Sequence, residues 1–427
     1  MKHSQLIQII KNGKLDSTLT SLYGEQNIPY QKERYISAIN EFVSLYGEEQ
    51  DLELFSVPGR SELSGNHTDH NCGCVIAASI DLDVIAVVSK AAGCVVRVKS
   101  AGHEANCVDI SEYTSPRPEM YGKSDAIIAG MFKGMSEKGY STGGFVAYTT
   151  SSVPGGAGLS SSAAFENMIG TIINHLYNDG KIDNVEIAKI SQYAENEFFG
   201  KPCGLMDQVA CAVGGIVAID FADPFTPVIQ PIDFNLTANG YNLCIVNTGG
   251  NHADLTDDYA SVRAEMKAVA TQCGGSVLRE TDEQTVINNI PDLRESVGDR
   301  GILRALHFFE ENKRVAAQKQ ALLDGDIEKF FDAVKESGKS SFCYLQNVYT
   351  TKNLTEQGLS LALCLADITL SGKDGAFRVH GGGFAGTIQA YVKSEDVAQF
   401  KSVMDATFGD GACLVLGIRS LGAAKIY

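Results

Sequence analysis

The hydrophobic pattern of the chain changes from helical to strand-like near residue 50. Before that point apolar residues recur at helical spacing, as in YISAINEFVSLYG (residues 35–47), and predict a mostly helical N-terminal extension over residues 1–50. After it, apolar and β-branched runs of strand length are separated by glycine or polar breaks. The strands predicted in this way cover residues 75–89, 93–100, 143–150, 214–221 and 240–249.

Helical stretches lie between these strands. They are expected at residues 163–178 and 186–199, and a long helical region is expected from about 255 to 365. Two more strands are predicted at 376–384 and 387–392. Strands and helices interleave without a regular βαβ repeat, which favours an α+β fold over a doubly wound parallel sheet.

The chain is long enough for two domains with separate cores, since it has 427 residues. The irregular segment FADPFTPVIQPIDF (221–234) is interpreted as the loop between them. We therefore expect an N-terminal extension at 1–50, a first domain at 51–225 and a second domain at 226–427.

Composition and charge narrow the classes of partner. The formal charge of −17 argues against a nucleic-acid-binding surface, which needs clustered Lys and Arg. No secretory leader and no run of roughly 18 apolar residues is seen, so a membrane role is not expected. Eleven cysteines without a zinc-like spacing fit a reducing, cytoplasmic location. We expect a monomer or a weak homo-oligomer.

The strongest single motif is a glycine-rich loop, VPGGAGLSSSAAFE, which joins a predicted strand to a predicted helix. Its glycines let successive N–H groups face one concavity, and its serines lie at the start of the helix, where the helix dipole favours an anion. A serine-capped helix after a glycine turn is the alternative, but three serines in this context favour phosphate binding. The expected nucleotide-binding residues are Gly155, Gly156, Ala157, Gly158, Leu159, Ser160, Ser161 and Ser162.

Four motifs together resemble one known family. They are PGRSELSGNHTDHNCG (58–73), VPGGAGLSSSAAFE (153–166), GKPCGLMDQVA (200–210) and RVHGGGFAG (378–386). Their content and order resemble the GHMP kinases, and among these the galactokinases. The resemblance covers roughly residues 50–427. It implies an ATP-dependent sugar 1-kinase that uses Mg²⁺ and has its active site between two domains.

The resemblance also assigns catalytic roles to individual residues. Asp207 matches the catalytic aspartate, which favours loss of the proton from the anomeric hydroxyl. Arg60 matches an arginine that keeps this aspartate ionised. Glu195 matches a Mg²⁺ ligand, with Ser162 or its neighbour Ser161 as the second one.

The sugar contacts come from the same comparison. His67, Asp69, Gly204 and Tyr259 match residues that hold the sugar, and the glycines at 381–383 match a loop that closes over the nucleotide and substrate. An Asx turn or a helix cap is the main alternative role for His67 and Asp69. A mevalonate- or homoserine-type kinase is a further alternative, but those relatives lack the HTD motif.

The first motif departs from its usual form, GRVNLIGEHTDYNGG. Ser61, Glu62 and Ser64 replace common residues, His70 stands where tyrosine is usual, and Asn66 replaces a glutamate that accepts a hydrogen bond from the sugar's C6 hydroxyl. A tryptophan common in the adenine pocket is also missing, because the chain has none. The segment at 124–135 is expected to cover that region.

Asn66 admits three interpretations as a substrate-binding residue. Its amide still bonds a C6 hydroxyl, so galactose remains the first choice of substrate. Loss of the carboxylate also removes a repulsion of roughly 4 kcal/mol between charges about 4 Å apart, which favours galacturonate or another C6-modified galactose. His70 points the same way in the resemblance to galacturonate kinases. The third interpretation is a non-catalytic sugar sensor, which the intact phosphate loop disfavours.

Overall fold

The computed structural model describes residues 1–250 and 255–427. Within these residues the strands form one eight-stranded and one four-stranded sheet. The larger sheet has the order β12-β1-β2-β5-β3-β4, and β6 and β7 extend it from the first half of β2. Its strands are β1 (Glu53–Ser64), β2 (Cys74–Lys90), β3 (Val95–Ser100), β4 (Ala105–Asp109), β5 (Phe145–Ser151), β6 (Ile216–Asp220), β7 (Val228–Ile232) and β12 (Ala424–Lys425).

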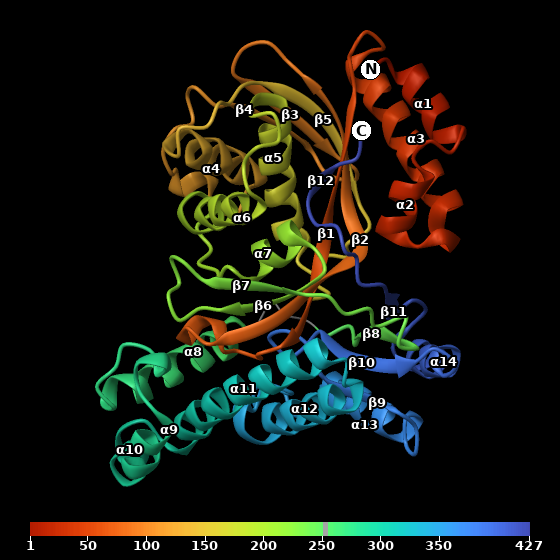
Figure 1. Cartoon of the computed structure of the whole chain (residues 1–427). Helices are drawn as coiled ribbons and strands as arrows, with labels where there is room; N and C mark the ends of the chain where they lie inside the picture. Colours follow the sequence, from red (N-terminus) through yellow and green to blue (C-terminus); the bar gives the residue numbers. More distant parts are fainter. Residues whose placement is uncertain (251–254) are drawn as a thin grey trace.

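Helices cover both faces of this sheet (Figure 1). On β2, Ile85 and Val87 pack with the N-terminal helices, whereas Ala86 and Val88 pack on the opposite side. This alternation is what a strand buried on both faces requires. The N-terminal helices are α1 (His3–Lys11), α2 (Asp16–Tyr23) and α3 (Ile28–Tyr46). The opposite face carries α4 (Ser124–Glu137), α5 (Ser161–Tyr177), α6 (Asn184–Tyr193) and α7 (Met206–Val213).

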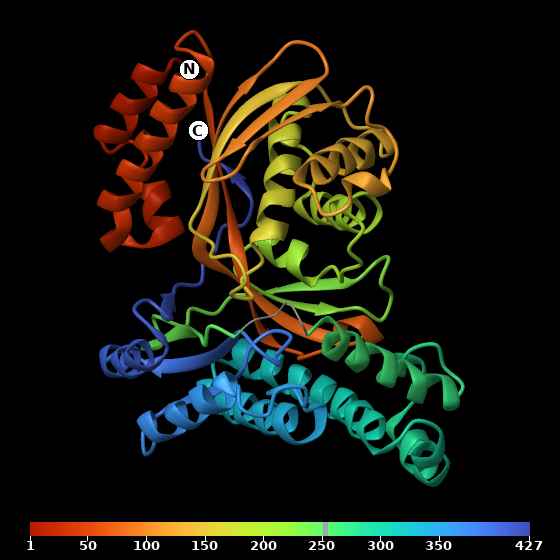
Figure 2. The ribbon, with the colours of Figure 1, turned by 180° about the vertical axis from the view of Figure 1, so that it is seen from behind.

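A second unit is built on the four-stranded antiparallel sheet, in the order β11-β8-β10-β9. Figure 2 shows it below the first unit, with the long helices α11 and α12 running along it. Its strands are β8 (Tyr241–Asn247), β9 (Gly375–Val379), β10 (Thr387–Lys393) and β11 (Cys413–Leu416). Its helices are α8 (Thr256–Gln272), α9 (Glu283–Asn288), α10 (Ile290–Ser296), α11 (Asp299–Asp324), α12 (Ile327–Ser340), α13 (Gly358–Thr369) and α14 (Val397–Phe408). The α+β class predicted from the sequence is confirmed.

The N-terminal helices are joined to the first unit by a buried carboxylate. Asp83 of β2 is fully buried and forms ion pairs with Arg34 of α3 at 2.6 Å and with Arg419 of the C-terminal segment at 3.2 Å. It also accepts hydrogen bonds from Tyr23 and Ser56. Burial alone raises the pKa of Asp83, but the two guanidinium groups outweigh it and hold the pKa below its usual value. Segments from both terminal regions of the chain therefore contact the same carboxylate of the sheet.

The predicted interdomain loop at 221–234 contains a strand, so that expectation is wrong in part. β7 (Val228–Ile232) pairs with β6 and with no other strand among the described residues, so Pro231 lies on an edge strand. An edge strand tolerates proline because the missing N–H faces away from the ladder. The short strands β4, β11 and β12 and the helix α14 were not foreseen either.

The division of the chain into 51–225 and 226–427 remains an expectation. The strand pairings show that the chain passes from the first sheet to the second between β7 and β8 and returns to the first sheet at β12. Among the described helices, none is both long and apolar enough to cross a bilayer.

Candidate active site

The glycine-rich loop runs from β5 to α5 and lies against the second unit. Gly156 and Gly158 have positive φ angles of 74° and 67°, which a residue with a side chain rarely adopts. A Cβ at Gly158 would lie 3.3 Å from His380 Nδ1 on the other unit. Ala157 and Leu159 are buried and anchor the loop in the core. The exposed residues of the loop are Gly155, Gly156, Gly158 and Ser162, and these are the ones available to a phosphate chain.

Arg60 and Asp207 form a bidentate ion pair at the end of this loop. Arg60 Nε donates to Asp207 Oδ1 at 2.8 Å, and its Nη2 donates to Oδ2 at 2.6 Å. Burial alone lowers the pKa of Arg60, but the charge and hydrogen bonds of Asp207 raise it overall, so the arginine stays charged. Ser160 Oγ donates to the same carboxylate, and Arg60 donates to the carbonyl of Gly158. The loop and the carboxylate are therefore directly connected.

Glu195 lies beside this pair on a π-helical turn, η4 (Ala194–Phe199), and is almost fully buried. Its Oε1 pairs with Lys201 at 3.1 Å. The amide of Gln208 donates to Glu195 Oε2 at 2.9 Å and to Glu166 Oε2 at 3.1 Å, so it bridges two carboxylates. Burial and the charge of Glu195 raise the pKa of Glu166 well above its usual value. Glu166 and Glu195 therefore lie close together near the start of α5, the helix that follows the glycine-rich loop.

One oxygen without a protein partner makes this pair of carboxylates a candidate for binding a divalent cation. Glu166 Oε1 is buried and has no hydrogen-bond partner among the described residues. No group of three or more His, Cys, Asp and Glu side chains able to hold a metal occurs in the described part of the chain. Two protein carboxylates completed by substrate phosphates form the type of site that Mg²⁺ commonly uses.

Two of the predicted sugar contacts, His67 and Tyr259, bond to the glycine loop at 381–383. His67 Nε2 donates to the carbonyl of Gly382 at 2.8 Å, and Tyr259 OH donates to that of Gly383 at 2.8 Å. Asp69 lies against Gly204, where an added Cβ would be 2.5 Å from Asp69 Oδ2. Residues from the first and second units therefore meet at one junction.

Asp69 is the most perturbed acidic group of this set. Burial raises its pKa to about 6, and the charges of Glu62 and Asp207 add to the effect. The N–H of His70 donates to Asp69 Oδ1 at 2.8 Å and opposes the shift. A half-buried carboxylate with so few donors is suited to accept hydrogen bonds from hydroxyl groups of a ligand.

Comparison with known proteins identifies the fold and the family. Residues 126–215 match the N-terminal domain of GHMP kinases, and residues 40–90 match the galactokinase galactose-binding signature. A galactokinase of Clostridium tetani (strain Massachusetts / E88) is 30% identical over 369 residues, which cover 84% of this chain and 89% of that protein. A galactokinase of Streptomyces coelicolor is 32% identical over 371 residues, with 86% and 91% covered. The chain belongs to the galactokinase family.

Solved structures agree on the fold. Lactococcus lactis galactokinase complexed with galactose has a TM-score of 0.75 at 23% identity and covers 92% of this chain and 100% of its own. Methanococcus jannaschii mevalonate kinase has a TM-score of 0.61 at 16% identity, with 87% and 99% covered. The two-unit architecture is therefore that of the GHMP kinases.

The side chain of Asn66 is bonded to protein groups in this galactokinase family member. Its side chain is fully buried. The amide NH₂ donates to Gly381 O at 2.5 Å and to Glu62 Oε1 at 3.2 Å. The amide oxygen accepts from Asn347 at 2.8 Å and from Ser341 at 3.4 Å. Protein partners use the whole hydrogen-bonding capacity of the amide, so this geometry does not support a direct contact with the sugar's C6 group.

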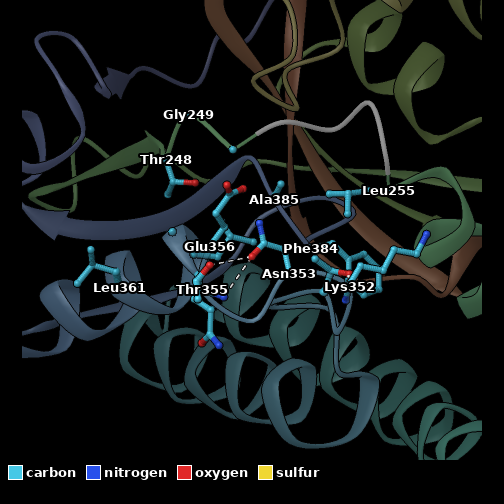
Figure 3. Close-up of a pocket in the computed structure, with 15 residues that line it drawn as sticks. Thr248, Gly249, Leu255, Lys352, Asn353, Thr355, Glu356, Leu361, Phe384 and Ala385 are labelled. Atoms are coloured by element: carbon cyan, nitrogen blue, oxygen red, sulfur yellow. Dashed lines mark hydrogen bonds between the residues drawn. The ribbon is translucent and has the colours of Figure 1, made fainter.

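Two pockets differ in their relation to these residues. One of about 440 Å³ is lined by Ser161, Ser162 and Phe165 of α5 together with Ser124 of α4 and His103, so it opens beside the phosphate loop. A larger pocket, of about 850 Å³, lies on the second unit between Gly249, Phe384 and the segment around Asn353 (Figure 3). None of the predicted site residues is among the described residues that line the larger pocket.

Sequence reasoning missed Glu166, Gln208 and Lys201. Glu166 stands in an otherwise apolar stretch, AAFENMIG, and a single acid at a core-facing helical position was a signal that could have been used. Gln208 directly follows the predicted base Asp207. Lys201 carries no comparable signal, because an isolated lysine in a loop is usually solvated.

Proposed function

We propose that this protein transfers the γ-phosphoryl group of ATP to the anomeric hydroxyl of galactose or a closely similar sugar. The observation that carries the proposal is the contact among Arg60, Asp207 and Ser160, which joins a carboxylate, a cation and the phosphate loop at the junction of two units. The galactokinase relatives and the galactose complex of the Lactococcus lactis enzyme support it.

In this proposal Asp207 acts on the sugar hydroxyl. Arg60 fixes both of its oxygens, so the carboxylate is oriented to accept the proton of the hydroxyl. Asp69 orients the sugar by accepting hydrogen bonds, and Gly204 leaves room for it because any side chain there would strike Asp69. Positioning and charge carry most of the catalysis of phosphoryl transfer, and these residues supply both.

The phosphate chain of ATP is assigned to the loop at 155–162 and the start of α5. Glu195 and Ser162, or its neighbour Ser161, would hold Mg²⁺, and Glu166 lies behind Glu195 as a second acid. When bound, the ion neutralises charge on the phosphate oxygens. The space over the loop at Gly155 and Gly156 is open, since no protein atom apart from the chain neighbours lies within 4 Å of where a Cβ would stand at either position.

The adenine base is assigned to the pocket of about 440 Å³ beside Ser161 and Ser162. Phe165 and His103 line it and offer ring faces in a chain that has no tryptophan. Ser124 at the start of α4 belongs to the segment 124–135 that the sequence predicted for this region. A cytoplasmic location is part of the proposal, because all eleven cysteines lie in the described part of the chain and are free.

Release of ADP with a panel of sugars tests the proposal. Purified protein is supplied with MgATP and galactose, galacturonate, N-acetylgalactosamine or arabinose. We expect sugar-dependent ADP with galactose or with a sugar that differs from it at C6. Folded protein that binds a sugar and ATP but releases no ADP with any of the four would instead identify a sensor.

A further inference from the structure

We propose that Glu62 and Asn66, together with Asn347 and Arg378, form a clasp that positions the glycine loop at 381–383 over the sugar site. The proposal rests on the proposed function for its kinetic consequence, but its structural part stands alone. It makes Asn66 a positioning residue.

The first half of the clasp is a buried ion pair. Glu62 at the end of β1 is 5% exposed and Arg378 on β9 is fully buried. Arg378 Nη2 lies 2.8 Å from Glu62 Oε1, which is the same oxygen that accepts the hydrogen bond from Asn66. One positive and one negative charge are thus matched inside the junction. A second carboxylate beside Glu62 would have no cation of its own among these partners.

The second half of the clasp holds the carbonyl groups of the glycine loop. Asn66 donates to Gly381 O, and Asn347 donates both to Asn66 Oδ1 and to Gly382 O at 3.2 Å. Gly383 packs so closely on Asn347 that an added Cβ would overlap its carbonyl oxygen, at 2.0 Å. His67 and Tyr259 donate hydrogen bonds to carbonyl groups of the same loop. The clasp therefore fixes the position of the glycine loop to which these two predicted sugar contacts are bonded.

The main chain of Asn66 is held as firmly as its side chain. His307 Nε2 donates to Asn66 O at 3.0 Å, and Asn66 N donates to Glu311 Oε1 at 3.4 Å. Both partners lie on α11 and are fully buried. Four elements of the second unit thus fix one residue of the first: α11, the turn at Ser341, the segment at Asn347 and the glycine loop.

The departures of the first motif now have a common explanation. The usual motif, GRVNLIGEHTDYNGG, has asparagine at position 62 and glutamate at position 66, whereas this chain has Glu62 and Asn66. The two side chains are hydrogen-bonded to each other, so the carboxylate and the amide have exchanged places within one contacting pair. Ser61 and Ser64 also bond to the second unit, through His380 and Gln318. The polar residues that replace the usual ones, at 61, 62, 64 and 66, therefore form one polar seam between the two units.

A double-mutant cycle tests the clasp with substitutions that keep size and move charge. Asn66→Asp removes the donor to Gly381 O and places a second carboxylate beside Glu62. We expect a fall in Tm of at least about 4 °C and a rise of about tenfold in KM for the sugar, with KM for ATP within about threefold. Glu62→Gln leaves Arg378 without its charge partner and lowers Tm as well. In Glu62→Gln/Asn66→Asp the charges are exchanged, and at least half of both losses should be recovered.

Asn174→Asp is the matched control, because Asn174 is also buried and hydrogen-bonded but lies on α5, where it contacts Ile182. It should lower Tm and leave the sugar KM unchanged. If Asn66→Asp does not fold, Asn347→Ala removes the donors to Asn66 and Gly382 and should raise the sugar KM in the same way.

Three results would overturn the proposal. They are an unchanged Tm and sugar KM in Asn66→Asp, single effects that simply add in the double variant, and a lower Tm with an unchanged sugar KM. If the wild-type protein turns over no sugar, the proposed function fails, and the clasp is then judged by Tm and by calorimetric binding of galactose. If the protein binds no sugar at all, the Tm values of the double-mutant cycle alone decide whether the clasp exists.

Discussion

At the scale of single residues, the predicted catalytic carboxylate, Asp207, is bonded directly to the glycine-rich loop. Asp207 is held by Arg60 from β1 and by Ser160 from the start of α5, and Arg60 is held in turn by the carbonyl of Gly158. A bidentate pair fixes the rotation of a carboxylate as well as its position. Displacement of the loop by a bound nucleotide would therefore be transmitted to Asp207.

Asp69 gives this site a predictable dependence on pH. Burial raises the pKa of Asp69 to about 6, and protonation turns one of its two acceptor oxygens into a hydrogen-bond donor. Sugar affinity should therefore fall as the pH is lowered from 7 to 5, by about tenfold for a group with this pKa. Isothermal titration calorimetry with galactose between these pH values measures the change.

Asp69→Asn is the control for this dependence. The variant should bind sugar weakly at every pH and lose the slope. Because the folded pKa lies above the unfolded one, the ionised form is less favourable in the folded state, so the neutral variant should have a higher Tm at pH 7. A wild-type affinity that is flat from pH 5 to 7 would show that Asp69 does not carry the sugar contact.

The sequence anticipated which residues meet, but it did not anticipate how Asn66 is used. Arg60 and Asp207 are far apart in the chain and lie together, as the resemblance suggested, while their catalytic roles stay predictions. Asn66 is expected to contact the sugar because it stands where the family motif has a glutamate that bonds the C6 hydroxyl. Its actual partners come from α11, Asn347 and the glycine loop, and pattern alone gives no information on contacts across more than 200 residues.

At the scale of elements, the N-terminal helices support the entry to the phosphate loop. Arg34 on α3 donates to the carbonyls of Asp83 and Thr150 as well as to the Asp83 carboxylate. Ser152, which precedes the loop, exchanges hydrogen bonds with the main chain of Asp83. The N-terminal extension, whose purpose the sequence left open, thus stabilises the strand that leads into the glycine-rich loop.

Arg34→Met should weaken both stability and nucleotide binding. Breaking one partner of a buried pair costs about 3–5 kcal/mol, and Arg419 remains to offset part of that loss. We expect a fall in Tm of about 10 °C and a KM for ATP that rises more than the KM for sugar. Thermal melts and initial-rate kinetics measure the two effects.

Lys32→Met is the matched control, since it lies on the same helix and its pair with Asp16 is partly exposed. Such pairs contribute less than about 1 kcal/mol, so this variant should behave like the wild type. Arg34→Lys keeps the charge but not the three-way hydrogen bonding and should fall between the two. Equal effects of Arg34→Met on both KM values would argue against a specific link to the phosphate loop.

The elements that pattern predicted well are those buried on both faces. β2 is a long apolar run and β5 begins with a short one, and both agree with the prediction, as does the helical character of the extension. β7 was missed because Pro231 and the exposed Val228 disguise an edge strand, and α14 was missed because its buried face is limited to Phe400 and Met404. Short or half-exposed elements are specified by their neighbours more than by their own periodicity.

At the scale of the whole molecule, the site belongs to neither unit alone. The first unit supplies Arg60, Asp207 and the phosphate loop, and the second supplies Tyr259 and the glycine loop at 381–383. The ends of the chain lie together on the first unit, as Figures 1 and 2 both show. The second unit is joined to it by two chain crossings, by the polar seam and by an apolar core cluster that includes Ile76 of β2 and Phe330 of α12. Relative movement of the units would change the sugar contacts and leave the pair of Arg60 and Asp207 intact.

The position of the transferred phosphate, compared in the wild type and Asp207→Asn, tests the central claim most directly. Phosphorus NMR of a reaction with MgATP and galactose, or with whichever sugar of the panel releases ADP, identifies the product. The account predicts phosphate on the anomeric oxygen, one ADP for each sugar phosphate, and a loss of at least about 100-fold in kcat for Asp207→Asn with sugar and ATP still bound. Phosphate on another oxygen, or a variant with near-normal kcat, would contradict it.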